Sequence, residues 1–150
     1  IALKEDTKDD EYTRKVIETM GDRVSIITSG NGMKQWLTFA PHCQGWLSGS
    51  GGFNPSIEID FYEHYLNGNL DKCKEIIDTV EVPFNKIKDK FGWHLGIKSA
   101  MDIMGVMSRI ERMPLQQLPD DNHFEIIKMM KEISKKTSYF HTLGGKLDKK

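Results

Sequence analysis

The feature that most constrains the fold is an alternation of strand and helix that repeats three times near the start of the chain. Short runs rich in β-branched residues alternate with segments whose apolar residues recur at helical spacing, and the loops between them are short. This order favours parallel strands wrapped by helices, an α/β fold. Three such units cannot close a barrel and would leave open sheet edges. The expected strands are 1–3, 24–28 and 45–48, and the expected helices are 9–20, 33–40 and one that begins at Asn54-Pro55.

From Leu70 onward the sequence shows helical patterns only. One apolar face extends from Leu70 to Ile87, and Pro83 within it is expected to kink or split the element, because proline cannot continue the helical hydrogen bonding. Two further helices are expected over 95–107 and 124–133, and the polar, basic tail 144–150 is expected to fray.

The composition excludes several classes of protein. The 150 residues contain 21 Lys+Arg and 22 Asp+Glu, a net charge of −1, which argues against a nucleic-acid partner. No apolar run approaches the roughly 20 residues that cross a bilayer, so no membrane partner is expected. Cys43 and Cys73 lack metal-ligand spacing, and the five histidines form no close pair, so we expect a reduced, cytoplasmic protein without a metal.

The chain begins at Ile1 with a short apolar run that leads directly into Lys4-Glu5-Asp6. Such a run is typical of the end of a strand whose beginning is missing. We therefore expect the sequence to be part of a longer protein.

Small or reactive residues follow each of the three expected strands. In a (β/α) barrel the carboxyl ends of the strands form the active site, where a desolvated lysine can act as a nucleophilic amine. On these residues alone, Lys4 could equally be a solvated surface residue, and the glycine-serine runs could be flexible turns. Gly49–Gly52 could also bind a phosphorylated ligand. The three segments are Lys4-Glu5-Asp6, Ser29-Gly30-Asn31-Gly32 and Ser48-Gly49-Ser50-Gly51-Gly52.

Five motifs, in the right order and spacing, resemble the second half of the dihydrodipicolinate synthase / N-acetylneuraminate lyase family. The resemblance extends from Ile1 to about Ile133. It implies a (β/α)8 TIM barrel, of which this chain is the end of strand six onward, plus a C-terminal three-helix segment. The division implied is a barrel part over 1–68 and a helical segment with a polar tail over 69–150. The motifs are Ala2-Leu3-Lys4-Glu5, Ser29-Gly30, Gly45-Trp46-Leu47-Ser48 with Pro55, Asn67-Gly68-Asn69-Leu70-Asp71, and Ile97-Lys98-Ser99-Ala100 with Gly105 and Arg112-Met113-Pro114-Leu115.

The resemblance also implies a reaction. Lys4 would form a Schiff base with pyruvate or another 2-keto acid, and Ser29, Gly30 and Ser48 would line the pocket beside the intermediate. The enzyme would be a class I lyase, either an aldolase, a dehydratase or a pyruvate-condensing synthase. No metal or organic cofactor is implied, and a homo-dimer or homo-tetramer is expected. The family's proton-relay tyrosine and its hydroxyl pair match no position in this chain, which again indicates missing upstream sequence.

Two departures from the family pattern concern the distal part of the substrate. Asn31-Gly32-Met33 stands where members often carry acidic residues, and Gly52 stands where an asparagine is common. They indicate a pocket different from that of either namesake enzyme. Two alternatives stay open: a phosphate-binding barrel enzyme without a covalent lysine, and a non-catalytic barrel with a binding role.

Overall fold

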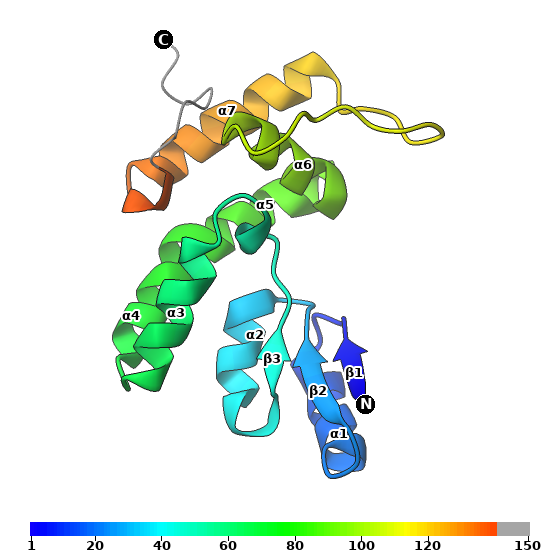
Figure 1. Cartoon of the computed structure of the whole chain (residues 1–150), viewed down its shortest axis with the longest axis vertical. Helices are drawn as coiled ribbons and strands as arrows, with labels where there is room; N and C mark the ends of the chain where they lie inside the picture. Colours follow the sequence, from blue (N-terminus) through cyan, green and yellow to red (C-terminus); the bar gives the residue numbers. More distant parts are fainter. Residues whose placement is uncertain (141–150) are drawn as a thin grey trace. The chain divides into compact units, whose positions relative to one another are not determined.

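A computed structural model describes residues 1–140, which form two compact units, Ile1–Ser48 and the part from Gly49 onward. The first unit contains the three strands, and the second is helical (Figure 1). The expected fraying of 144–150 lies outside the described residues.

The first unit is a three-stranded parallel sheet in the order β1-β2-β3, as the alternation predicts. Helices connect each strand to the next, because parallel neighbours need a crossover. Its core is apolar and lies between the sheet and the two helices, around Ile26, Met33, Trp36 and Phe39. The elements are β1 (Ala2–Glu5), α1 (Asp10–Met20), β2 (Ser25–Thr28), α2 (Gly32–Phe39), a 3-10 turn (Ala40–His42) and β3 (Gly45–Trp46).

The structure corrects the expected ends of two strands. The first was expected to stop at residue 3, but β1 continues through Lys4 to Glu5. Both residues pair with β2, in register with Ile27 and Thr28, so the lysine lies within a strand rather than after it. The third strand was expected over 45–48 but pairs only at Gly45–Trp46.

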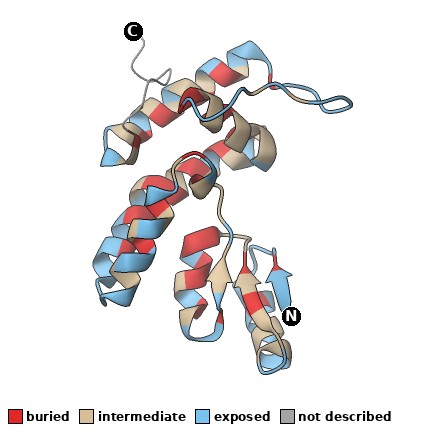
Figure 2. Ribbon diagram, in the orientation of Figure 1, coloured by how far each residue is buried: buried red, intermediate tan, exposed pale blue. Residues whose placement is uncertain are grey.

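The second unit is a set of helices packed through one apolar side of each. In Figure 2 the buried residues lie along one side of these helices. Phe61, Phe84, Ile87, Ile126 and Met130 are among its most buried side chains. The elements are a 3-10 turn (Ser50–Gly52), α3 (Ser56–Leu66), α4 (Leu70–Ile76), a π-helical turn (Ile77–Glu81), α5 (Val82–Phe91), α6 (Trp93–Ile103), α7 (Asp120–Ser134) and a 3-10 turn (Ser138–Phe140).

The interruption predicted near Pro83 is confirmed, and it takes the form of the π-helical turn that precedes this residue. The other two helices have different ends from those expected. The helix expected over 95–107 is α6, Trp93–Ile103, and Gly105 follows it with a φ of 77°, a left-handed conformation that ends helices readily. The helix expected over 124–133 is α7, which begins four residues earlier, at Asp120.

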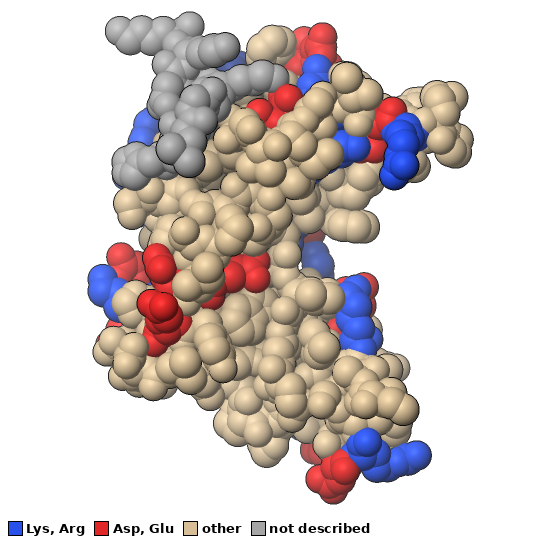
Figure 3. Space-filling view, viewed as in Figure 1, with Lys and Arg blue, Asp and Glu red and all other residues tan. Residues whose placement is uncertain are grey.

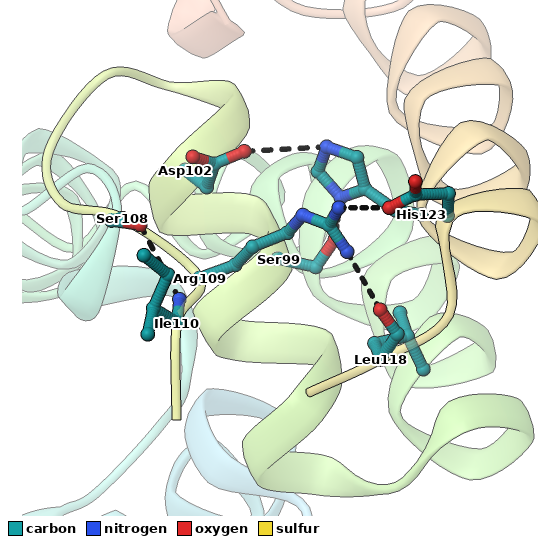
Figure 4. Close-up of polar contacts among 8 residues, drawn as sticks. Ser99, Asp102, Ser108, Arg109, Ile110, Leu118 and His123 are labelled. Atoms are coloured by element: carbon teal, nitrogen blue, oxygen red, sulfur yellow. Dashed lines mark hydrogen bonds and ion pairs between the residues drawn. The ribbon is translucent and has the colours of Figure 1, made fainter. Parts of the chain in front are cut away.

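A buried histidine joins α6 to α7. The imidazole of His123 lies between two side chains of α6, with Nδ1 at 2.6 Å from Ser99 Oγ and Nε2 at 3.3 Å from Asp102 Oδ2 (Figure 4). Close by, the Arg109 guanidinium donates to the Leu118 carbonyl at 2.6 Å and pairs with Asp120. These contacts join α6 to α7 and tie the loop between them, at Arg109, to the start of α7.

The charged side chains are distributed in small groups. On the face drawn in Figure 3, both acidic and basic groups appear, separated by uncharged surface. In the part of the chain that the structure describes, no helix is long and apolar enough to span a bilayer.

Candidate active site

Three loops meet at one edge of the parallel sheet. Glu5, Thr28 and Trp46 are neighbours in the strand register, and the pairing continues one step beyond it. Ser29 N donates to the Glu5 carbonyl and Leu47 N to the Thr28 carbonyl, both at 2.8 Å. The carboxyl ends of all three strands therefore lie side by side, as the predicted site requires.

Lys4 and Glu5 point to opposite faces of the sheet, because side chains alternate along a strand. Glu5 is buried on the helix face, where its carboxylate accepts from the Thr13 hydroxyl of α1 at 2.5 Å. Lys4 is consequently on the face that the helices leave open. Its side chain is 48% exposed and forms an ion pair with Asp6, so the desolvation expected of this lysine is not found in the described residues.

Asp6 links the lysine to the second strand end. Its Oδ2 lies 2.8 Å from Lys4 Nζ, and its carboxylate also accepts a hydrogen bond from the Ser29 side chain. The Lys4 hydrogen bond, followed by that from Ser29, holds the pKa of the Asp6 carboxyl below its usual value of 3.8. The structure therefore brings Lys4 and Ser29 together through a carboxylate that the sequence reasoning missed.

The buried Glu5 carboxylate shapes the loop that follows Lys4. Besides Thr13, it accepts from Thr7 N at 2.8 Å. Gln35 of α2 donates to both the Thr7 carbonyl and the Thr13 hydroxyl, each at 3.0 Å. Because these partners come from β1, α1 and α2, the network ties the loop after Lys4 to both helices.

Gly30 is the point of closest approach between the first two loops. A Cβ built there would lie 1.7 Å from the Thr7 carbonyl oxygen and 2.9 Å from Lys8 N, so no side chain fits. The glycine predicted to line the pocket thus also allows the two loops to pack together.

Ser48 follows β3 by two residues and is partly buried. It lies on the same edge of the sheet as Ser29, since both come after the carboxyl end of a parallel strand. The place of Ser48 beside a bound intermediate stays a prediction.

The glycine-rich loop of the second unit already binds a carboxylate. Glu58 of α3 accepts from Gly51 N at 2.6 Å and from the Ser50 hydroxyl at 3.2 Å. A phosphate would need these donors, so the loop holds an internal anion where the phosphate-binding alternative placed a ligand.

A cavity lies away from Lys4. A cavity of about 450 Å³ opens between α1 and α2, and Arg14, Asp22, Phe39 and His42 are among its lining residues. Asp22 precedes β2, so this cavity is at the opposite end of the strands from Ser29. Within residues 1–140, no group of three or more His, Cys, Asp or Glu side chains is placed to hold a metal ion.

Comparison with known proteins confirms the family resemblance over most of the chain. The model of the dihydrodipicolinate synthetase family matches residues 1–133. A protein of Bacillus licheniformis, named as a probable 5-dehydro-4-deoxyglucarate dehydratase, is 32% identical over 113 residues, which cover 71% of this chain and 36% of that protein. The 4-hydroxy-tetrahydrodipicolinate synthase of a Psychrobacter species is 24% identical over 127 residues, which cover 84% of this chain and 41% of that enzyme.

The fold is also similar to that of a solved structure. A protein from Pseudomonas aeruginosa, provisionally assigned as a dihydrodipicolinate synthetase, superposes with a TM-score of 0.71 at 21% sequence identity, covering 88% of this chain and 45% of that one. The chain therefore spans less than half the length of each of these three proteins. Since the family model matches nearly the whole described sequence, the chain belongs to the dihydrodipicolinate synthetase family.

Proposed function

We propose that the chain is part of a Schiff-base lyase in which Lys4 forms a covalent bond with pyruvate or another 2-keto acid. Family membership supports the reaction class. The observation that carries the proposal is the position of Lys4, whose amine lies on the open face of the sheet, at the carboxyl ends of parallel strands, linked through Asp6 to Ser29.

The proposed chemistry starts with attack of the Lys4 amine on the ketone carbon. The iminium that forms withdraws electrons from the adjacent carbon, so a bond to that carbon can form or break. Aldol cleavage, condensation and dehydration can all proceed from this intermediate, and the proposal covers the three. Ser29, Gly30 and Ser48 would lie beside the bound acid, because they follow the neighbouring strands at the same edge. As the family resemblance implies, the enzyme would act as a homo-dimer or homo-tetramer, and its two free thiols favour the cytoplasm.

Borohydride trapping tests the proposal directly. The protein that carries this sequence is incubated with pyruvate and reduced, and the modified residue is located by mass spectrometry of proteolytic fragments. We expect a single reduced adduct on Lys4, absent from Lys4→Ala and from samples reduced without the keto acid. Lys8→Ala is the matched control, since Lys8 is an exposed lysine four residues along the chain, and it should still be modified.

Two results would contradict the proposal. One is the absence of any adduct with a panel of 2-keto acids. The other is an adduct that persists in Lys4→Ala, which would show that the reactive amine lies elsewhere. The first result would leave the two alternatives, a phosphate-binding barrel enzyme without a covalent lysine and a non-catalytic barrel with a binding role.

A further inference from the structure

The cavity between α1 and α2 belongs to the first unit but has no part in the proposed reaction. Its volume is about 450 Å³, within the range of roughly 300 to 1,000 Å³ that is usual for small-molecule sites. It lies at the opposite end of the strands from Ser29. A ligand in this cavity would therefore be separate from the 2-keto acid bound at Lys4.

Side chains of both charges line this cavity. The Arg14 guanidinium and the Glu18 carboxylate come from α1, one helical turn apart, and Asp22 follows the end of the same helix. His42 comes from the 3-10 turn after α2. Within residues 1–140, neither carboxylate forms an ion pair with Arg14, so the opposite charges are available to a bound molecule.

The Arg14 guanidinium is held over an aromatic ring. Its Cζ lies 5.5 Å from the centroid of the Phe39 ring, a cation–π contact. Phe39 is only 4% exposed, so the ring belongs to the core and gives the guanidinium a fixed support. A guanidinium over a ring face keeps the N–H groups in its plane able to donate, and this planar fork matches the two oxygens of a carboxylate.

Glu18 and Asp22 supply the opposite charge. Both are exposed, and among the described residues neither side chain has a hydrogen bond or an ion pair. These two carboxylates repel a ligand that carries only negative charge, and the Arg14 guanidinium repels one that carries only positive charge. A ligand with one anionic and one cationic group matches both kinds of side chain.

The rest of the wall is largely apolar and is attached to the sheet. Ile17 and Pro41 line the cavity together with Phe39. Gln44 joins the wall to β2, because its backbone N donates to the Ile26 carbonyl at 2.9 Å and its side-chain oxygen accepts from Ile26 N at 2.7 Å. The cavity therefore combines the charged groups with an apolar surface whose position the sheet fixes.

We propose that this cavity binds a small zwitterion, an α-amino acid with an uncharged, apolar side chain. Arg14 binds its carboxylate, Glu18 and Asp22 bind its ammonium group, and Phe39 with Ile17 contacts its side chain. The site is separate from Lys4, and the proposal does not depend on the Schiff-base function.

Three ligands with the same branched carbon chain separate the two charges. L-leucine carries both, isocaproate lacks the ammonium group, and isoamylamine lacks the carboxylate. Each is titrated into the protein that carries this sequence, and isothermal titration calorimetry measures its affinity. We expect L-leucine to bind at least about 10-fold more tightly than either analogue, because each analogue leaves one set of charged groups without its partner.

Variants of the lining residues assign each charge to its partner. Arg14→Gln should weaken the binding of L-leucine by about 10-fold and should not weaken that of isoamylamine. Glu18→Gln and Asp22→Asn should weaken L-leucine and should not weaken isocaproate. Lys15→Gln is the control, since Lys15 is exposed on α1, pairs with Glu11 and does not line the cavity. Circular dichroism of each variant checks that the fold is retained.

Four results would overturn the proposal. The first is equal affinity for the three ligands, which would indicate an apolar cavity without charge recognition. The second is no binding of L-leucine, valine, methionine or phenylalanine, and the third is L-leucine binding that Arg14→Gln leaves unchanged. The fourth is a dimer that Arg14→Gln dissociates in sedimentation velocity, which would place a second copy of the chain in the cavity. Each of these results leaves the borohydride test of Lys4 unaffected.

Discussion

Gly30 lies where the loop after β1 leaves no room for a Cβ atom. A Cβ built on Gly30 would lie 1.7 Å from the Thr7 carbonyl oxygen of that loop, far closer than van der Waals contact. We expect Gly30→Ala to push the two loops apart and to lower the free energy of unfolding by about 2 kcal/mol, in the range of overpacked sites. Urea denaturation followed by circular dichroism measures the change.

Gly45→Ala is the matched control for this prediction. Gly45 belongs to β3 of the same unit, and a Cβ there meets nothing within 4 Å. Its stability should stay close to that of the unmodified chain. Equal stabilities of the two variants would contradict the steric argument, because both make the same chemical change.

The resemblance to a known family, rather than residue chemistry, singled out Lys4 and Ser29 in the sequence. Asp6 was missed because the first strand was expected to end at residue 3, which placed Lys4 and Asp6 in a loop without a defined direction. In the structure β1 extends through Lys4 to Glu5, and Asp6, directly after the strand, has its Oδ2 2.8 Å from Lys4 Nζ. The available signal was the two-residue spacing, which has meaning only once the strand end is known.

At the scale of elements, the contact between α6 and α7 depends on one imidazole. Ser99, Asp102 and His123 have the composition of a catalytic triad, but Ser99 is only 1% exposed, so its hydroxyl is closed to a substrate. The cluster therefore serves to join the two helices. We expect His123→Ala to lower the free energy of unfolding by about 3 kcal/mol, because it leaves a cavity and removes the partner of the buried Ser99 hydroxyl and of the partly buried Asp102 carboxylate.

Thermal and urea denaturation would measure this loss, with Lys128→Ala as the control. Lys128 is exposed on the same helix, and alanine is a good helix former, so that variant should unfold like the unmodified chain. A His123→Ala variant as stable as Lys128→Ala would show that the imidazole does not join α6 to α7.

The ends of the helices could be predicted only in part. Apolar residues continue past the end of α6, at Met104, Val106 and Met107, so periodicity alone extended the helix. The chain leaves the helix at Gly105, and Val106 and Met107 are exposed. The start of α7 was expected too late in the chain, because its first turn has no apolar pattern of its own. The helix begins directly after Pro119.

At the scale of the whole molecule, the parallel order of the strands followed from the alternation with helices and is confirmed. The division into a barrel part and a helical segment after residue 68 came from the family resemblance and stays a prediction. The compact units divide after Ser48 instead, because α3 packs on α4, where Cys73 Sγ donates to the Phe61 carbonyl at 3.4 Å. A helix of a barrel can pack on its sheet and on the next helix at the same time. The packing of α3 on α4 therefore does not decide where the barrel part ends.

Each compact unit contains one free, buried thiol, Cys43 in the first and Cys73 in the second. Burial, together with the nearby Glu5 charge, raises the pKa of Cys43 from 9.0 to about 11, and burial also raises the pKa of Cys73. Only the thiolate reacts, and a pKa raised by two units lowers its fraction at pH 8 by about 100-fold. We therefore expect Cys43 in the folded chain to react with a thiol reagent at pH 8 at least about 100-fold more slowly than in the urea-unfolded chain, and Cys73 to react more slowly as well.

Alkylation with iodoacetamide, read by mass spectrometry, would follow the two thiols separately, and Cys43→Ser and Cys73→Ser would assign each rate. The Cys43 rate should rise as the pH increases toward 11, because the thiolate fraction grows up to the raised pKa. A thiol that reacts as fast in the folded chain as in urea would contradict its burial.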